Sequence, residues 1–168
     1  GALRDPCEEV RLFAYAALEN RAGALCRSIL EARRRLEEPL APARKGALHR
    51  QLATDHWELA HQGLAQGEVL QHVLAEALRH GREAAAADPE RAGLRLLLAR
   101  ILLRGGRGDD AETALRAAAR LGMARAAILP YLAEAAFLRR RFDLVRERVL
   151  ESTRWRPPAL ARAWEYWT

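Results

Sequence analysis

The second half of the sequence repeats itself with a period of 34 residues. The recurring positions are Leu98-Ala99 with Leu132-Ala133, Ala111 with Val145, Leu115 with Val149, Ala118 with Ser152 and, two periods apart, Pro89 with Pro157. A fixed period of this length is typical of stacked units, each of which buries its apolar face against its neighbours. The period therefore predicts an array of similar units.

The residue types predict that these units are helical. The 168 residues include 35 Ala and 28 Leu but only 12 Val, Ile and Thr together. Ala and Leu favour helices, whereas β-branched residues favour strands. Proline and glycine divide the chain into expected helices at 5–36 (with or without a bend near 20–23), 47–67, 69–87, 91–104, 109–121, 125–138 and 143–152, with a last one after Pro158. The chain is predicted to be all-α.

Three details of these boundaries are explicit expectations. Pro39 and Pro42 should end the first long helix, which leaves residues 38–45 as a linker. Asp109 or Asp110 should cap the helix that begins there, and Gly122 should end it.

The spacing of bulky and small residues resembles the tetratricopeptide repeat (TPR). Unit 92–125 matches its pattern at Leu98, Ala99, Leu102, Gly106, Ala111, Leu115 and Ala118, and unit 126–159 at Leu129, Leu132, Ala133, Phe142, Val145, Val149 and Pro157. Unit 54–91 matches at Trp57, Ala60, Leu64, Gly67, Ala77, Ala84 and Pro89 if its second helix is one turn longer. The departures are Arg95 at a bulky position, Met123 in place of proline and Arg140 in place of the turn glycine.

The resemblance implies a right-handed α-solenoid of antiparallel helix pairs. Residues 1–45 would form an N-terminal helical extension, either one helix or a hairpin, with its linker. Residues 46–168 would hold the three repeats and a terminal capping helix at 160–168. The alternative is a helical bundle without structural repeats, in which the 34-residue recurrence arises by chance.

A narrower resemblance involves residues 57–67, Trp-Glu-Leu-Ala-His-Gln-Gly-Leu-Ala-Gln-Gly, together with Leu18-Glu19-Asn20-Arg21. These strings are similar to the cytoplasmic TPR region of the PelE family, an inner-membrane component of bacterial Pel exopolysaccharide secretion. That resemblance implies a scaffold that contacts the cyclic-di-GMP receptor and the glycosyltransferase of the machinery. The chain begins with Gly1 and its single methionine is Met123, so we expect it to be part of a longer protein whose other segments carry any membrane helices.

The sequence contains few combinations of residues that could support catalysis or bind a cofactor. The five histidines, His49, His56, His61, His72 and His80, never fall at the i, i+4 spacing of a helical metal pair, and we expect surface or partly buried imidazoles. Residues 105–108 read as a turn between helices and not as a phosphate-binding loop. No nucleophile and base can be assembled, so we predict no enzyme, metal site or cofactor.

By resemblance, the first helices of the TPR units line a concave groove. The residues expected to face it are Asp55, Glu58 and Gln62 in the first unit, Leu96, Leu97, Arg100 and Arg104 in the second, and Tyr131, Glu134, Phe137 and Leu138 in the third. We predict that this groove binds a protein partner, although the curvature of a solenoid could bury its apolar residues instead. The set lacks the Asn and Lys residues with which some TPR domains hold a peptide C-terminus.

A second candidate surface is basic and aromatic. The formal net charge is +6, and the excess lies in residues 85–168, with Arg139, Arg140 and Arg141 in the densest basic stretch. Trp164 and Trp167 lie at the end of the chain, where they cap the array or dock on a partner or a second copy. The alternative function is therefore a basic module that binds nucleic acid or lipid headgroups. The favoured prediction is a non-enzymatic scaffold in the cytoplasm, the soluble part of an inner-membrane protein, with no specific nucleic-acid partner.

Overall fold

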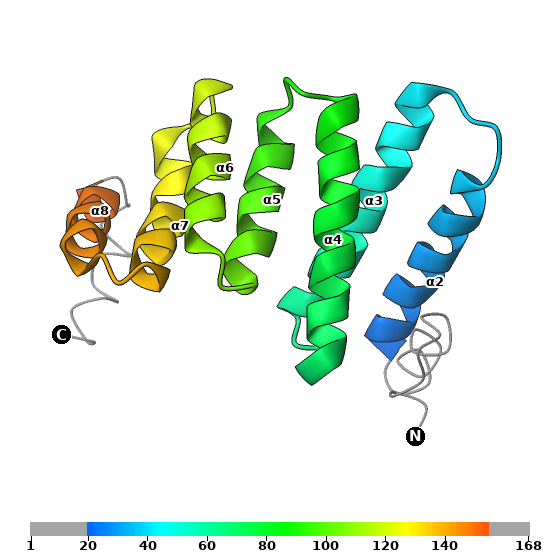
Figure 1. Cartoon of the computed structure of the whole chain (residues 1–168), viewed down its shortest axis with the longest axis horizontal. Coiled ribbons are helices and arrows are strands. Elements are labelled where there is room, and N and C mark those ends of the chain that lie inside the picture. The colour runs from blue at the N-terminus through cyan, green and yellow to red at the C-terminus, as the bar shows by residue number, and fades with distance from the viewer. Residues whose placement is uncertain (1–19, 155–168) are drawn as a thin grey trace.

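The protein is a row of antiparallel α-helices (Figure 1). The computed structural model describes residues 20–154, which form seven helices and no strand. The helices are α2 (Asn20–Leu36), α3 (Pro42–His61), α4 (Gly67–Ala87), α5 (Ala92–Arg104), α6 (Gly108–Arg120), α7 (Arg125–Leu138) and α8 (Phe142–Arg154). This confirms the prediction of an all-α, TPR-like helical solenoid. The expected helix before residue 20 and the capping helix at 160–168 lie outside the described residues.

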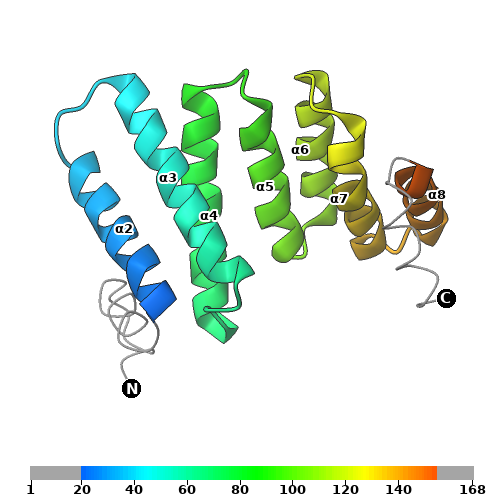
Figure 2. The same cartoon turned by 180° about the vertical axis from the view of Figure 1, so that it is seen from behind.

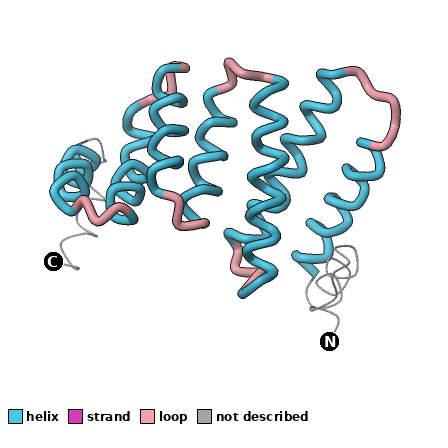
Figure 3. Tube along the Cα trace, viewed as in Figure 1, coloured by secondary structure: helices cyan, strands magenta, loops and turns pink. Residues whose placement is uncertain are grey.

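The helices form two layers along the row. Figure 2 shows α3, α5 and α7 toward the viewer, with α4 and α6 behind them, and α5 contacts both α3 and α7. Short loops join successive helices (Figure 3), which forces each helix to run antiparallel to the one before it. The first helices of the three pairs therefore share one face of the molecule.

The 34-residue period is visible in the helix boundaries. The end of α5 and both ends of α6 return 34 residues later as the end of α7 and both ends of α8. Gly106 ends the α5 turn with φ 74°, and Arg140, one period later, has φ 57°. A left-handed residue other than glycine costs roughly 1 kcal/mol, so the repeat geometry imposes this conformation on Arg140.

Three boundary predictions are wrong. The helix expected to continue to a break at Gly67 ends at His61, where Gly63 takes a left-handed conformation with φ 72° in the turn that follows, and Gly67 instead begins α4. Pro42 does not end the first helix but is the first residue of α3, which begins five residues earlier than the expected start at 47. Proline fits there because the first helical N–H needs no partner and φ is already helical. Neither Asp109 nor Asp110 caps α6, since the cap residue is Arg107; both acids lie in the first turn, where the helix dipole favours negative charge.

Of two other local predictions, one is confirmed and one is confirmed in direction only. The second helix of the first unit, α4, is longer than α6, but by eight residues (21 against 13), about two turns, where one turn was expected. Gly122 follows α6 with φ 86°, a conformation that suits glycine at the end of a helix.

The core consists of the positions that define the repeat. Leu98, Leu102, Leu115 and Leu132 are buried, as predicted. Val149, one period after Leu115, is only half-buried, because α8 is the last described helix and no described element covers its outer side.

Close packing between successive pairs depends on a glycine. A Cβ atom on Gly108, at the start of α6, would lie 2.9 Å from the carbonyl oxygen of Ala135 in α7. The absence of a side chain therefore lets α6 approach the backbone of α7. No helix within residues 20–154 has both the length and the apolar character needed to cross a membrane.

Candidate functional site

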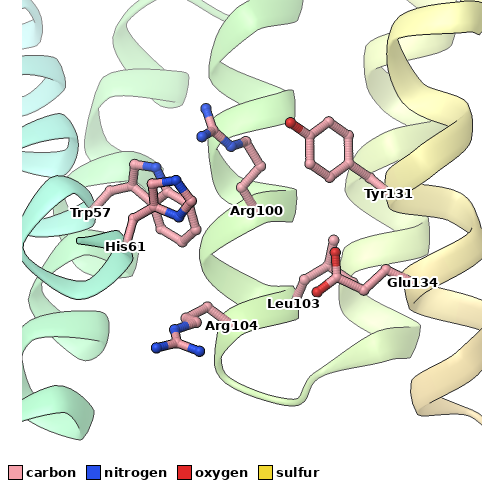
Figure 4. Close-up of a pocket in the computed structure, with 7 residues that line it drawn as sticks. All are labelled: Trp57, His61, Arg100, Leu103, Arg104, Tyr131 and Glu134. Carbon is pink, nitrogen blue, oxygen red and sulfur yellow. The ribbon is translucent and has the colours of Figure 1, made fainter. Parts of the chain in front are cut away.

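The first helices of the three pairs enclose a groove with a volume of about 370 Å³. Its lining residues are Trp57 and His61 from α3, Arg100, Leu103 and Arg104 from α5, and Tyr131 and Glu134 from α7 (Figure 4). The residues are four apart on α3 and three apart on α7, and on α5 Leu103 and Arg104 follow Arg100 by three and four positions, which places each set on one side of its helix. The stacking of the pairs brings the three faces together.

Arg100 lies between two aromatic rings in this groove. The central guanidinium carbon is 4.9 Å from the centre of the Trp57 ring and 6.0 Å from that of Tyr131. His61 stacks on Trp57 with ring centres 5.1 Å apart and an interplanar angle of 17°. Cation–π contacts of this kind contribute about 0.5–1 kcal/mol when exposed and more when desolvated. They orient the guanidinium group while leaving it on the wall of the groove.

The charged groups of the groove have no internal ion pairs. Within the described part of the chain, no carboxylate pairs with Arg100 or Arg104, and no cation pairs with Glu134. Arg104 is exposed one helical turn beyond Arg100, and Glu134 lies across from it on α7 (Figure 4). The groove therefore presents two guanidinium groups along α5 and one carboxylate on the opposite wall.

The structure distributes the predicted groove residues between three environments. Arg100, Arg104, Tyr131 and Glu134 line the groove. Leu96 and Leu97 are half-buried and pack against the apolar core. Phe137 and Leu138 are exposed at the end of α7, outside the lining, where Phe137 meets Phe142 edge to face with ring centres 6.0 Å apart.

In the first unit, the groove is lined by Trp57 and His61 and not by Asp55, Glu58 and Gln62. Asp55 accepts a hydrogen bond of 2.6 Å from Ser28 of α2, and burial raises the pKa of its carboxyl group despite that bond. The side chain of Gln62 donates to Glu58.

Sequence reasoning missed three of the lining residues: Trp57, His61 and Leu103. Trp57 was assigned to packing within its own repeat, and it is indeed almost fully buried. Helical spacing could have identified the other two lining residues, since His61 follows Trp57 by four residues and Leu103 follows Arg100 by three.

The densest basic stretch is largely engaged in internal ion pairs. Glu112 of α6 is only 4% exposed and pairs with Arg139, with Arg116 at 2.9 Å and with Arg148 at 3.0 Å. Arg148 also donates to the carbonyl oxygen of Leu132 at 2.6 Å. Burial alone would raise the pKa of Glu112, but the Arg148 hydrogen bond and the three positive charges outweigh it and lower that pKa. This cluster joins α6, α7 and α8.

The remaining residues of the basic and aromatic candidate surface do not join this cluster of ion pairs. Arg141 pairs with Asp143 at 3.3 Å. Arg140 is exposed and forms no ion pair within residues 20–154. Trp164 and Trp167 lie outside the described residues.

Three histidines, His49, His56 and His80, meet between α3 and α4. The expectation of surface or partly buried imidazoles holds for His49, His61 and His72 and is wrong for His56 and His80. His56 and His80 are 1% and 2% exposed, and their rings stack at 5.9 Å. Arg79 donates to Nε2 of His80 at 3.0 Å, so neutral His80 carries its proton on Nδ1 and donates it to Nδ1 of His49 at 2.8 Å. Burial, with the charge of Arg79, lowers the pKa of His80 to about 3. No group of three ligating side chains suited to a metal ion occurs in the described part of the chain.

The helix pair α5–α6 has counterparts in a known family. Residues 70–128 match the family model of the tetratricopeptide repeat. The match includes the three groove residues of α5 and the start of α7. TPR units are generally protein–protein interaction modules. The chain matches no curated protein and no solved structure.

Proposed function

We propose that this protein is a non-enzymatic scaffold that binds a segment of a partner protein in the groove between α3, α5 and α7. The observation that carries the proposal is the placement of Arg100 between Trp57 and Tyr131 on the wall of that groove. Arg, Trp and Tyr are the residues most enriched among binding hot spots, which lie in well-packed pockets.

The lining suits binding better than catalysis. Leu103 adds an apolar contact, while the guanidinium and carboxylate groups around it supply directional contacts. The basic side chain His61 stacks on Trp57, and no nucleophile stands beside it in the lining. The proposal therefore includes no reaction.

A finer proposal is that the partners belong to the Pel exopolysaccharide machinery at the cytoplasmic face of a bacterial inner membrane. Its support is the resemblance of residues 57–67 to the PelE family. Two residues of that string, Trp57 and His61, line the groove. On this proposal the partners are the cyclic-di-GMP receptor and the glycosyltransferase.

The alternative is a basic module that binds nucleic acid or lipid headgroups. It is supported by the net charge of +6 and by exposed arginines such as Arg140. It is weakened because Arg139, Arg141 and Arg148 are occupied by internal ion pairs. We therefore favour a protein partner.

Partner capture by charge-reversed variants tests the scaffold proposal. Arg100→Glu with Arg104→Glu should weaken capture of the native partner at least about tenfold, or about 1.4 kcal/mol, while the protein stays folded and its melting temperature falls only by the loss of the Arg100 cation–π contacts. The matched control is Arg82→Glu with Arg120→Glu, which makes the same change of charge on α4 and α6, outside the groove. Equal capture by the wild type and the groove variant would exclude this groove. Tyr131→Ala and Phe137→Ala, made singly and then together, separate the groove from the end of α7.

The Pel partners are tested by direct titration. The purified cyclic-di-GMP receptor and glycosyltransferase should each bind the wild-type chain more tightly than the Arg100→Glu, Arg104→Glu variant. Capture of unrelated proteins that depends on the groove would retain the scaffold and exclude these partners.

A further inference from the structure

We infer that the groove recognises an acidic segment, one in which Asp or Glu side chains alternate with apolar residues. The inference rests on the proposed binding function of the groove and adds the chemistry of the partner. It depends on three features of the lining: two unpaired guanidinium groups, their spacing, and the aromatic support of one of them.

The first feature is that neither groove arginine forms an ion pair with a carboxylate of residues 20–154, a state that they share with some exposed arginines outside the groove such as Arg140. Arg33, Arg107 and Arg148 each form an ion pair with an acid of the described chain at 3.0 Å or less. Arg100 and Arg104 form none within the same residues. A carboxylate of a partner protein could therefore form an ion pair with either guanidinium group.

The second feature is geometric. Arg100 and Arg104 are four residues apart, so they stand about 5–6 Å apart at Cβ on one face of α5. Side chains on the same side of an extended peptide are spaced by about 6.6 Å. In Figure 4 the two guanidinium groups point away from one another along α5, so a peptide in which every second residue is acidic can reach them with acids at alternate or more distant positions.

The third feature is orientation. The rings of Trp57 and Tyr131 flank the guanidinium group of Arg100, with ring centres 4.9 and 6.0 Å from its central carbon, and so restrict its movement. A planar guanidinium group can donate two parallel hydrogen bonds to a carboxylate, and fixing it beforehand reduces the entropy lost on binding. Leu103 lies at the bottom of the groove and is only 5% exposed, whereas the half-buried ring of Tyr131 offers apolar surface to the residues between the acids.

The α7 wall of the groove further limits which partner can bind. Glu134 disfavours a second acid on the α7 side, so the charges of the segment should lie along α5. A membrane surface is disfavoured because the two guanidinium groups line a groove and not a flat face. The occupant is therefore an acidic stretch of protein.

Fluorescence anisotropy with three labelled peptides tests the inference at physiological salt. The probes alternate Leu with Glu, Gln or Lys. We expect the Glu peptide to bind wild-type protein at least about tenfold more tightly than the Gln peptide, and the Lys peptide to bind weakest. Arg104→Gln should remove most of that preference, and Arg120→Gln, the same substitution on exposed α6, should retain it. Arg100→Lys, which keeps the charge but loses the planar group, should lower the affinity for the Glu peptide.

Three results would overturn the inference. They are equal affinities for the Glu and Gln peptides, an equal loss in Arg104→Gln and Arg120→Gln, and no binding of the Glu peptide. Because Arg104 is exposed, its variant should fold normally, and its melting temperature checks this. If the Glu peptide does not bind but the groove variants still capture the native partner more weakly than the wild type, the scaffold function stands and only the acidic partner is excluded. If the native partner is captured equally by those variants, the groove function itself fails.

Discussion

Removing the carboxylate of Glu112 should destabilise the protein far more than removing an exposed one. In Glu112→Ala, three arginines lose a partner, but their environments differ. Arg116 is 70% exposed, so water solvates its guanidinium group, whereas Arg139 retains its ion pair with Asp109 at 2.6 Å. Arg148 is 15% exposed and keeps only the carbonyl oxygen of Leu132. The variant therefore leaves one largely buried cation without a counter-charge.

Breaking a buried ion pair from one side costs about 3–5 kcal/mol. Because Arg148 retains one hydrogen bond, we expect the lower end, about 3 kcal/mol. For a chain of this size that is a fall in melting temperature of roughly 6–12 °C. The matched control is Glu31→Ala, which removes an exposed i, i+4 pair with Arg35 at 2.9 Å. Its expected cost is about 0.3–0.5 kcal/mol.

Urea denaturation of the three proteins at several pH values measures these differences. The pKa of Glu112 is lowered from 4.5 in the folded protein, so its contribution is complete above pH 4.5. It is lost as the pH falls through the folded pKa, because protonation removes the charge. The gap between wild type and Glu112→Ala should therefore be constant at neutral pH and close in acid. A cost below about 1 kcal/mol, close to that of the control, would refute the assigned role of the buried pair.

Three further predictions concern the core and the histidines. Gly108→Ala should cost about 1–3 kcal/mol in the free energy of unfolding, since its Cβ would meet a backbone oxygen, whereas Gly93→Ala has open space and should be neutral or stabilising. Leu98→Ala should cost about 2–5 kcal/mol, and Arg95→Ala far less; similar losses would exclude the buried position of Leu98. Because burial lowers the pKa of His80 from 6.5 to about 3, stability should be complete above pH 6.5 and fall as the pH drops toward 3. His80→Gln cannot titrate, so its melting temperature should vary less over that range; parallel profiles would exclude His80 as the cause.

The repeat could be predicted from the sequence because it depends on local properties. Helix propensity, proline and glycine positions and the 34-residue recurrence all act within or between neighbouring turns. They predicted the bounds of α7 and the longer α4. They failed at Pro42, where the same residue can end one helix or begin the next, and only the packing of α2 against α3 decides between them.

The TPR resemblance placed Arg100, Arg104, Tyr131 and Glu134 on the groove side of α5 and α7, and these four residues line the groove. That the groove binds a partner stays a prediction. The α3 wall was not predicted correctly, because the rotation of that helix depends on how it packs between α2 and α4. A rotation of one residue exchanges the side chains that face the groove, and it replaced the expected Glu58 with Trp57.

What the sequence determined by itself is the helical class, the period and the apolar positions that define the repeat, because each depends on the order of residue types along the chain. Only the tertiary structure decided which charges neutralise one another. Glu112 and Arg148 are 36 residues apart, and no local pattern joins them. Among residues 20–154, the same packing left Arg100 and Arg104 without a paired carboxylate and turned them toward a groove. Ion pairing acts through space over a few ångströms, so the partners of a charge are fixed only once the helices are stacked.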